Sequence, residues 1–425
     1  MPIKKVLLAL VLSVVLAGCS LLPTKNTEEK ITLKYWGLWE NTSTINTAIE
    51  EYKKIKPNVE IAYEKRSPQQ HRESLISQIN QGKGPDIFRF HNTWTPMLES
   101  VMAPLPSSVM SADEFKKSFY PTTTKDLVNS SKKIVGIPLE IDGLALFYNE
   151  DLFAAAGIST PPQTWQELAQ DAAKLTVKDA TGNIKTAGVA LGTAEKVDHF
   201  SDILGLMILQ NGGDPKTATD KNTADALDYY VSFATGPNRV WDETMPASTI
   251  AFAGSQVAMY FAPSWRVFEI RNQDPVLNFK LAPVPQLEGG KVAWASYWAE
   301  GVSVKSAYQK EAWEFIKFLS DEERQTKLYS EAAKSPGRSF GEPYSRVSMA
   351  SKLTSHPQAG AIVADAPYMR SFPMASRTFD NGLNDQIIDA YKDAVNKILG
   401  GTSSAKALET TAQIVTKTLT QFGAK

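Results

Sequence analysis

Residues 31–90 read ITLKYWGLWENTSTINTAIEEYKKIKPNVEIAYEKRSPQQHRESLISQINQGKGPDIFRF, and this stretch decides the fold. Short, largely apolar runs predict strands, and apolar residues at helical spacing predict helices between them. The predicted strands are 31–35, 59–63 and 86–90, and the predicted helices are 42–55 and 71–81. This β-α-β-α-β order indicates an α/β lobe with a largely parallel sheet.

The length and composition of the chain exclude several classes of protein. It has 425 residues, 43% of them hydrophobic, with 45 Lys and Arg against 46 Asp and Glu. Single cores stop growing at roughly 250–300 residues, so we expect two or more lobes. The hydrophobic content excludes intrinsic disorder, and the balanced charge argues against a nucleic-acid-binding protein. One cysteine and four scattered histidines offer no zinc or other metal motif, and we expect no metal and no cofactor.

The first residues, MPIKKVLLALVLSVVLAGC, have the features of a secretory signal. Two lysines precede the apolar stretch 6–17, which is shorter than the ~20 residues that a membrane-spanning helix needs. The sequence Leu16-Ala17-Gly18-Cys19 resembles the bacterial lipobox, in which cleavage before the cysteine is followed by its lipidation. We therefore expect a signal peptide over 1–18, lipid on Cys19 and a polar tether over 19–30. This lipid would anchor the protein to the outer side of the bacterial cell membrane.

Tryptophans are expected in turns that follow predicted strands. They are Trp36, Trp39, Trp94, Trp265 and Trp298. In open α/β sheets, ligands bind outside the carboxyl ends of the strands. An indole there can cover the apolar C–H face of a sugar while polar neighbours hydrogen-bond its hydroxyls. The candidate polar neighbours are Glu40, Asn92, Asp142 and Glu300. For each tryptophan, packing between lobes is the alternative explanation.

Two further features of the sequence concern helices. The segment Thr164-Trp165-Gln166-Glu167 is a capping box that predicts the start of a helix ending at Leu175. Both Trp165 and Trp313 have apolar neighbours at helical spacing, so we expect them in the core. Two long helices are predicted over 384–399 and 405–422.

Several motifs resemble those of one protein family. The most specific is GIPLEIDGLALFYN at 136–149. Further motifs are GPDI at 84–87, PPQTWQEL at 161–168, AFAGSQVAM at 251–259 leading to Trp265, Tyr297-Trp298, and GGTSSAKALETTA at 400–412. Over residues 31–425 the chain resembles the extracellular solute-binding proteins of ATP-binding-cassette sugar importers, the group that contains maltose-binding protein.

This resemblance implies an α/β fold of two lobes, crossed three times by the chain, with a ligand cleft between them. It places the crossings near 140–143, 296–301 and 335–343. The lobes would then comprise 31–139 plus 300–340, and 143–297 plus 341–425.

The resemblance also implies ligand-binding residues. Asp142 corresponds to a cleft carboxylate in the first crossing, Trp265 to an aromatic that stacks on a sugar, and Trp298 to an aromatic of the second crossing. The loop ends at Trp36, Asn92 and Trp94 also correspond to positions facing the cleft. Tyr148 and Arg338 are also implied as ligand-binding residues, but each has an alternative explanation. Tyr148 could equally be a buried strand tyrosine, and Arg338 could be a solvated loop arginine.

The function that follows is binding of a carbohydrate outside the cytoplasm and its delivery to a membrane permease. We expect a monomer that is not an enzyme and binds no nucleic acid. Another polar solute, such as a polyol, a glycerol phosphate diester or a peptide, is the alternative within this class. A secreted glycoside hydrolase is the alternative from a different class, because it would also combine tryptophans with carboxylates.

Overall fold

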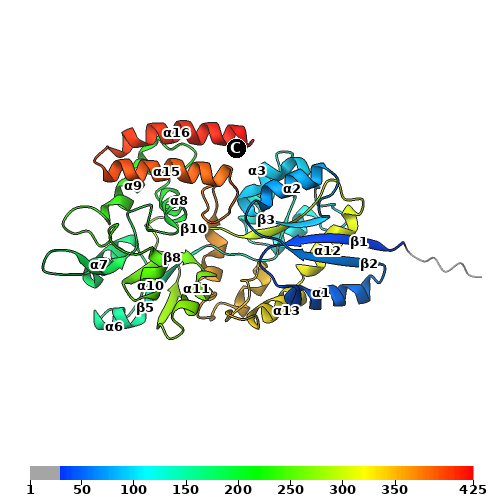
Figure 1. The fold of residues 1–425 in the computed structure, drawn as a ribbon, viewed down its shortest axis with the longest axis horizontal. Helices are drawn as coiled ribbons and strands as arrows, with labels where there is room; N and C mark the ends of the chain where they lie inside the picture. The colour runs from blue at the N-terminus through cyan, green and yellow to red at the C-terminus, as the bar shows by residue number, and fades with distance from the viewer. Residues whose placement is uncertain (1–28, 425) are drawn as a thin grey trace, which may run out of the picture.

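The computed structural model describes residues 29–424, so the predicted signal peptide, Cys19 and nearly all of the tether lie outside the described residues. Two five-stranded sheets form the centres of two lobes (Figure 1). The first sheet has the order β2-β1-β3-β11-β4. Its strands are β1 (Ile31–Gly37), β2 (Val59–Lys65), β3 (Ile87–His91), β4 (Ile137–Pro138) and β11 (Trp298–Val302). The strand β1 pairs in parallel with β2 and β3, which confirms the parallel β-α-β-α-β unit predicted for this segment.

The second sheet has the order β6-β7-β8-β5-β9. Its strands are β5 (Leu144–Asn149), β6 (Val177–Lys178), β7 (Ile184–Val189), β8 (Val257–Pro263) and β9 (Phe279–Ala282). The central strand β8 is buried along its whole length, as expected for a strand covered on both faces. A separate two-stranded sheet pairs β10 (Ala293–Trp294) with β12 (Met369–Arg370).

Helices cover both sheets, and most of the apolar residues at helical spacing in 42–55 are buried, although Ile55 at the end of this helix is exposed. The first lobe contains α1 (Thr42–Ile55), α2 (His71–Asn80), α3 (Thr95–Leu98), α4 (Ala112–Ser118), α5 (Thr123–Asp126), α12 (Gln309–Leu319) and α13 (Glu322–Ala333). Buried residues of α1 include Ile45, Ala48, Ile49 and Tyr52. Trp313 of α12 is fully buried, as predicted.

The second lobe contains the remaining helices. They are α6 (Glu150–Ala155), α7 (Trp165–Leu175), α8 (Phe200–Gln210), α9 (Lys221–Ser232), α10 (Ser248–Ala253), α11 (Arg266–Gln273), α14 (Gly360–Asp365), α15 (Leu383–Leu399) and α16 (Ser404–Gln421). The capping box of α7 is present, with Thr164 accepting from the Glu167 amide at 3.1 Å. The long helices α15 and α16 pack against each other along one edge of this lobe (Figure 1).

Three chain segments lie side by side between the lobes. The amide of Ser296 donates to the carbonyl oxygen of Asp142 at 3.0 Å, and the amide of Ile141 donates to the carbonyl oxygen of Pro343 at 2.9 Å. A Cβ atom at Gly143 would lie 1.9 Å from the carbonyl oxygen of Trp294. Only glycine therefore allows the first two crossings to approach this closely.

The third crossing ends later in the chain than the predicted 335–343. Residues 344–352 still contact the first lobe: Ser345 Oγ donates to the Pro138 carbonyl at 2.7 Å, and Ser348 Oγ donates to Glu322 at 2.6 Å. The chain reaches the second lobe at α14, which contacts β5 and β9. The stretch 344–352 thus belongs with the first lobe, because its polar groups are satisfied there.

Two searches of residues 29–424 bear on function. None of the helices in this range combines the length and the apolar character that crossing a membrane requires. Within the same range, no group of three or more His, Cys, Asp or Glu side chains is arranged to hold a metal ion.

Candidate functional site

A cavity of about 390 Å³ lies between the lobes, where the crossings meet the ends of β1, β3 and β8. Its lining residues are Trp39, His91, Glu140, Asp142, Pro263, Trp265, Arg266, Phe268, Glu269, Ser296, Trp298, Arg338, Glu342, Ser376, Arg377 and Phe379. Both lobes and the crossings contribute side chains. The volume is at the lower end of the roughly 300–1,000 Å³ that small-molecule pockets occupy.

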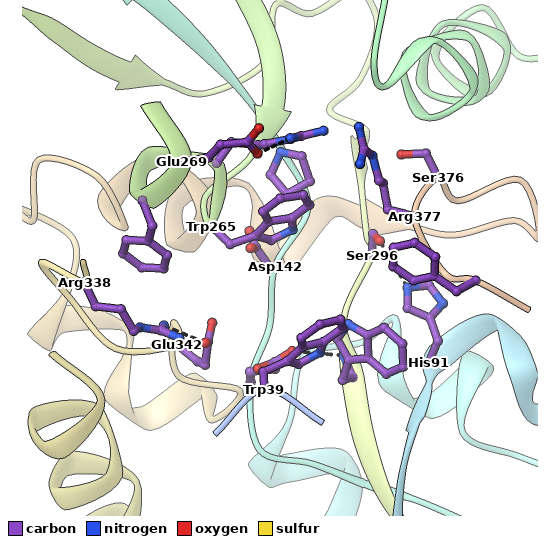
Figure 2. A pocket seen from close by; sticks show the side chains of 16 residues that line it. Trp39, His91, Asp142, Trp265, Glu269, Ser296, Arg338, Glu342, Ser376 and Arg377 are labelled. Atoms are coloured by element: carbon purple, nitrogen blue, oxygen red, sulfur yellow. Dashed lines mark hydrogen bonds and ion pairs between the residues drawn. The ribbon is translucent and has the colours of Figure 1, made fainter. Parts of the chain in front are cut away.

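Aromatic side chains form two facing walls of this cavity. Trp265 enters from the second lobe, directly after β8, and Trp39 enters from the opposite side, after β1 (Figure 2). The rings of Trp39 and Trp298 pack edge to face with centroids 5.6 Å apart. All three indoles are only partly buried. The cavity therefore presents apolar faces that only a ligand or water can cover.

Asp142 connects the first crossing to the turn that carries Trp265. Its carboxylate accepts hydrogen bonds from the Gly143 amide at 2.8 Å, the Ser264 amide at 3.1 Å and the Ser264 hydroxyl at 2.9 Å. Burial nevertheless raises the pKa of Asp142 to about 7. Most of the acceptor capacity of this carboxylate is thus used within the protein, and its clearest role is to position the Ser264–Trp265 turn.

The arginines of the cavity are paired with carboxylates. Arg338 Nη2 lies 2.6 Å from Glu342, and Arg377 Nη2 lies 3.1 Å from Asp198. The third, Arg266, pairs with Glu269 and donates from Nε to His199 at 2.9 Å. These pairings keep the cavity close to electrical neutrality.

Two lining groups besides Asp142 have strongly shifted pKa values. Burial and the nearby Glu342 carboxylate raise the pKa of Glu140 well above its usual range. Burial lowers the pKa of His91 to about 3, so its imidazole is neutral at physiological pH. Neutral His91, whose ring nitrogens hydrogen-bond Thr93 at 2.8 Å and Ser296 at 3.1 Å, adds no charge to the cavity, which suits an uncharged polar ligand.

Five of the eleven residues predicted as ligand-binding line the cavity: Trp39, Asp142, Trp265, Trp298 and Arg338. Trp298 is the first residue of β11 and does not follow a strand, in contrast to the prediction. Arg338 packs over the Phe268 ring at 4.4 Å, so it is not a free solvated arginine.

The other predicted residues lie elsewhere and are covered by protein. Trp36 belongs to β1, which is longer than predicted, and is buried beneath Arg66 at 4.3 Å. Trp94 is fully buried and packs against Trp298 at 5.3 Å. Asn92 is buried and donates to Asp126 at 3.0 Å. These three side chains already have protein partners, which removes the reason to expect a ligand on them.

The remaining three predicted residues also have protein partners. Glu40 and Glu300 both form ion pairs with the buried Arg89, and Glu300 is itself fully buried. Tyr148 lies half-buried in β5 and packs against Phe153 at 5.0 Å in the second lobe, away from the cavity, which is closer to the alternative of a strand tyrosine than to a ligand-binding role.

Most of the polar residues that line the cavity are not predicted from the sequence. Glu140 and Ser296 lie in the predicted crossings, and Arg266 directly follows Trp265, so a closer look at neighbours could have found them. Residues Ser376, Arg377 and Phe379 carry no sequence signal. Their place in the cavity depends on contacts with residues far away in the chain.

The fold and the site define a two-lobe α/β protein with a cavity between its lobes. The sequence model of the bacterial extracellular solute-binding proteins matches residues 36–326. The chain belongs to this family, as its motifs indicated.

Solved structures agree with this fold. A cyclo/maltodextrin-binding protein in complex with maltotetraose has a TM-score of 0.75 at 16% identity, covering 92% of this chain and 98% of the other. The sugar-binding protein MalE of Xanthomonas citri has a TM-score of 0.74 at 18% identity with the same coverage. A solute-binding protein of Thermotoga lettingae bound to tagatose has a TM-score of 0.68 at 20% identity, covering 92% and 100%. At these identities the likeness establishes the two-lobe α/β fold alone.

Curated relatives match over shorter regions. A binding protein of Brucella abortus is 33% identical over 24% of this chain and 25% of its own length. The sn-glycerol-3-phosphate-binding periplasmic protein UgpB of Yersinia enterocolitica is 26% identical over 58% of this chain and 60% of its own length. The chain therefore spans less than two thirds of the length of these relatives.

Proposed function

We propose that this protein binds a neutral carbohydrate between its lobes. The observation that carries this proposal is the pair of facing aromatic walls, Trp265 against Trp39 and Trp298, in a cavity whose arginines are all paired with carboxylates. A pyranose ring placed between them would cover apolar indole surface with its C–H faces. Its hydroxyls would then reach the surrounding carboxyl, imidazole and hydroxyl groups.

The charge balance supports a neutral ligand over an anionic one. Anion sites in proteins use arginines whose donors are free to form paired hydrogen bonds with the ligand. Here Arg266, Arg338 and Arg377 each already pair with a carboxylate. An anion would have to compete with these carboxylates for most of the guanidinium donors.

A glycerol phosphate compound is the second candidate. It is favoured by the 26% identity to UgpB and by one structural detail. Nη2 of Arg266 is buried without a hydrogen-bond partner among the described residues, and it lies 3.9 Å from Asp198. A phosphate oxygen that reached this nitrogen would satisfy it.

Delivery to a membrane permease follows from the same proposal. Ligand contacts from both lobes would favour the closed form, because a ligand shifts a conformational equilibrium only through its higher affinity for one state. A permease of an ATP-binding-cassette importer would then receive the closed protein. We propose lobes of 31–139 plus 300–352 and 143–297 plus 355–425, which adjusts the sequence-based boundary to the contacts of 344–352.

The membrane anchor is a separate part of this proposal and rests on Leu16-Ala17-Gly18-Cys19. Two acyl chains on Cys19 would hold the protein stably at the membrane surface. Mass spectrometry of the membrane fraction tests this directly. Wild-type protein should carry a diacylglycerol mass on Cys19, and an unmodified Cys19 in the mature chain would refute the anchor.

A thermal-shift screen tests the ligand class. The panel consists of neutral mono- and oligosaccharides together with sn-glycerol 3-phosphate and a glycerophosphodiester. A ligand at a hundredfold excess over its dissociation constant stabilises the folded protein by about 2.7 kcal/mol. We expect a sugar to raise the melting temperature while the phosphates leave it unchanged. A response to the phosphates alone would replace the first candidate by the second.

A further inference from the structure

Residues 376–382, between β12 and α15, form one end of the cavity. This loop, called the end loop below, contributes Ser376, Arg377 and Phe379 to the lining. Figure 2 shows Ser376 and Arg377 across the pocket from Arg338 and Glu342. The end loop and the Arg338–Glu342 pair thus bound the cavity at opposite ends, with the aromatic walls between them.

The backbone of the end loop is strained. Arg377, Phe379 and Asn381 have φ angles of 62°, 56° and 46°. Within residues 29–424 only six non-glycine residues have positive φ, and half of them fall in this loop. The left-handed region is unfavourable for residues with a Cβ, and it is least expected for a bulky side chain such as Phe379. Such strain persists only where surrounding contacts enforce it.

Contacts with the second lobe fix both ends of the end loop. The amide of Ser376 donates to the Asp202 carboxylate at 3.1 Å, and the Ser376 hydroxyl hydrogen-bonds His199 at 2.7 Å. The Asp380 carboxylate accepts from the amides of Gly382 at 3.0 Å and Asn384 at 2.9 Å. These hydrogen bonds fix the chain before and after Phe379 and so hold its side chain against the cavity.

Contacts with the first lobe close the space behind the end loop. Arg72 Nε, on α2, donates to the Asp380 carbonyl at 2.7 Å. Asn384 Nδ2 donates to Thr93 Oγ1 at 2.8 Å. The backbone therefore spans from one lobe to the other at this end of the cavity, and a ligand chain could not continue past it.

From these observations we propose that the end loop limits the length of the ligand, with Phe379 as the side chain that sets the limit. The proposal rests on the carbohydrate function above and narrows it to a mono- or disaccharide. The cavity volume of about 390 Å³ agrees with a ligand of this size. The strained backbone directs the Phe379 ring from this short loop into the cleft.

Calorimetric titration with sugars of increasing length tests this inference. The probes are glucose, maltose and maltotriose, and mannose, mannobiose and mannotriose, with tagatose as a further monosaccharide. The proteins are wild type, Phe379→Gly, Phe379→Asn and Asn381→Gly. Both Phe379 variants remove the ring and tolerate a left-handed backbone, so they should fold. Asn381→Gly is the matched control, because it relieves strain in the same loop at a residue that does not line the cavity.

The wild type should bind the mono- or disaccharide of one series at least tenfold more tightly than its trisaccharide. Both Phe379 variants should bind that trisaccharide at least tenfold more tightly than the wild type does, while Asn381→Gly keeps the wild-type preference. Equal or tighter trisaccharide binding by the wild type would overturn the length limit, as would an unchanged preference in both Phe379 variants. If none of these sugars binds any of the proteins, the carbohydrate function itself fails, and the length limit fails with it.

Discussion

Two regions that meet at β11 use similar side chains in different ways. The first is the cavity, with Trp39, Trp265 and Trp298. The second is a buried charge cluster within the first lobe, formed by Tyr35, Glu40, Arg89 and Glu300. In the cluster, Glu300 accepts from Arg89 Nε at 2.7 Å and from the Tyr35 hydroxyl at 2.9 Å.

The two regions differ in how much of their side-chain surface is left without a protein partner. Every residue of the charge cluster has protein partners, so the cluster contributes to folding and to the shape of the first lobe. The cavity tryptophans keep uncovered faces, so their contacts can be completed by a ligand. Residue type and position after a strand are therefore poor guides to a ligand site unless the partners of each side chain are also known.

The largest expected effect comes from breaking the charge cluster. Arg89→Met should lower the free energy of unfolding by about 3–5 kcal/mol, because it leaves Glu300 buried without its charge partner. Calorimetric melting measures this loss. The double variant Arg89→Met, Glu300→Leu should recover most of it, since the fully buried charge is then removed and only the partly exposed Glu40 loses its partner. A single variant that melts like the wild type would show that the cluster has no such role.

The next effect concerns the pH dependence of stability. The folded-state pKa of Asp142 is raised to about 7, above an unfolded value near 3.9, so the folded state binds more protons between these values. This group's contribution to stability is therefore fully present below pH ~4 and is lost as the pH rises toward about 7. Asp142→Asn removes this dependence.

Denaturant unfolding between pH 4 and 7.5 tests this expectation. The free energy of unfolding of Asp142→Asn minus that of the wild type should rise by a few kcal/mol across this range, since one pKa unit corresponds to about 1.4 kcal/mol. Subtraction removes the contribution of Asp365, whose pKa burial also raises to about 7. A difference that stays constant with pH would contradict the burial of an ionisable Asp142.

A smaller effect distinguishes the tryptophans of the cavity from those of the core. Trp265→Ala should weaken sugar binding tenfold or more, which corresponds to about 1.4 kcal/mol, and should leave the melting temperature of the ligand-free protein nearly unchanged. Trp313→Phe is the control, because Trp313 is fully buried in α12 away from the cavity. It should lower the melting temperature without changing affinity. If Trp265→Ala destabilises the protein and leaves affinity intact, Trp265 is a core residue.

The smallest effect concerns the contact between the lobes at the Arg338 end of the cavity. Phe268, on α11, packs against Phe340 at 4.6 Å and beneath Arg338 at 4.4 Å. Phe268→Ala should weaken ligand binding only a few-fold, because cation–π and aromatic contacts at accessible sites contribute about 0.5–1.5 kcal/mol. Titration calorimetry measures this change. A loss larger than that of Trp265→Ala would move the centre of the site to this end.

The sequence predicts the fold better than the site. The order of strands and helices over 31–90 follows from local periodicity, and the structure confirms it. Local sequence does not tell which indole a neighbour covers, so it predicts the cavity tryptophans together with Trp36 and Trp94. Arg66 covers Trp36, and this contact depends on tertiary packing.

The end loop could not be predicted for a related reason. The carbonyl of Asp380, the residue after Phe379, accepts a hydrogen bond from Arg72, which is 308 residues away in the chain. Propensities disfavour a left-handed phenylalanine, so only the assembled lobes fix this backbone.

The most direct test of the account is a crystal structure of the wild-type protein with the sugar that gives the largest thermal shift. We expect density for one or two rings between Trp265 and Trp39, with both lobes in contact with the ligand and the end loop at one end. Density for the sugar at any other site, or a ligand that contacts only one lobe, would contradict the central claim.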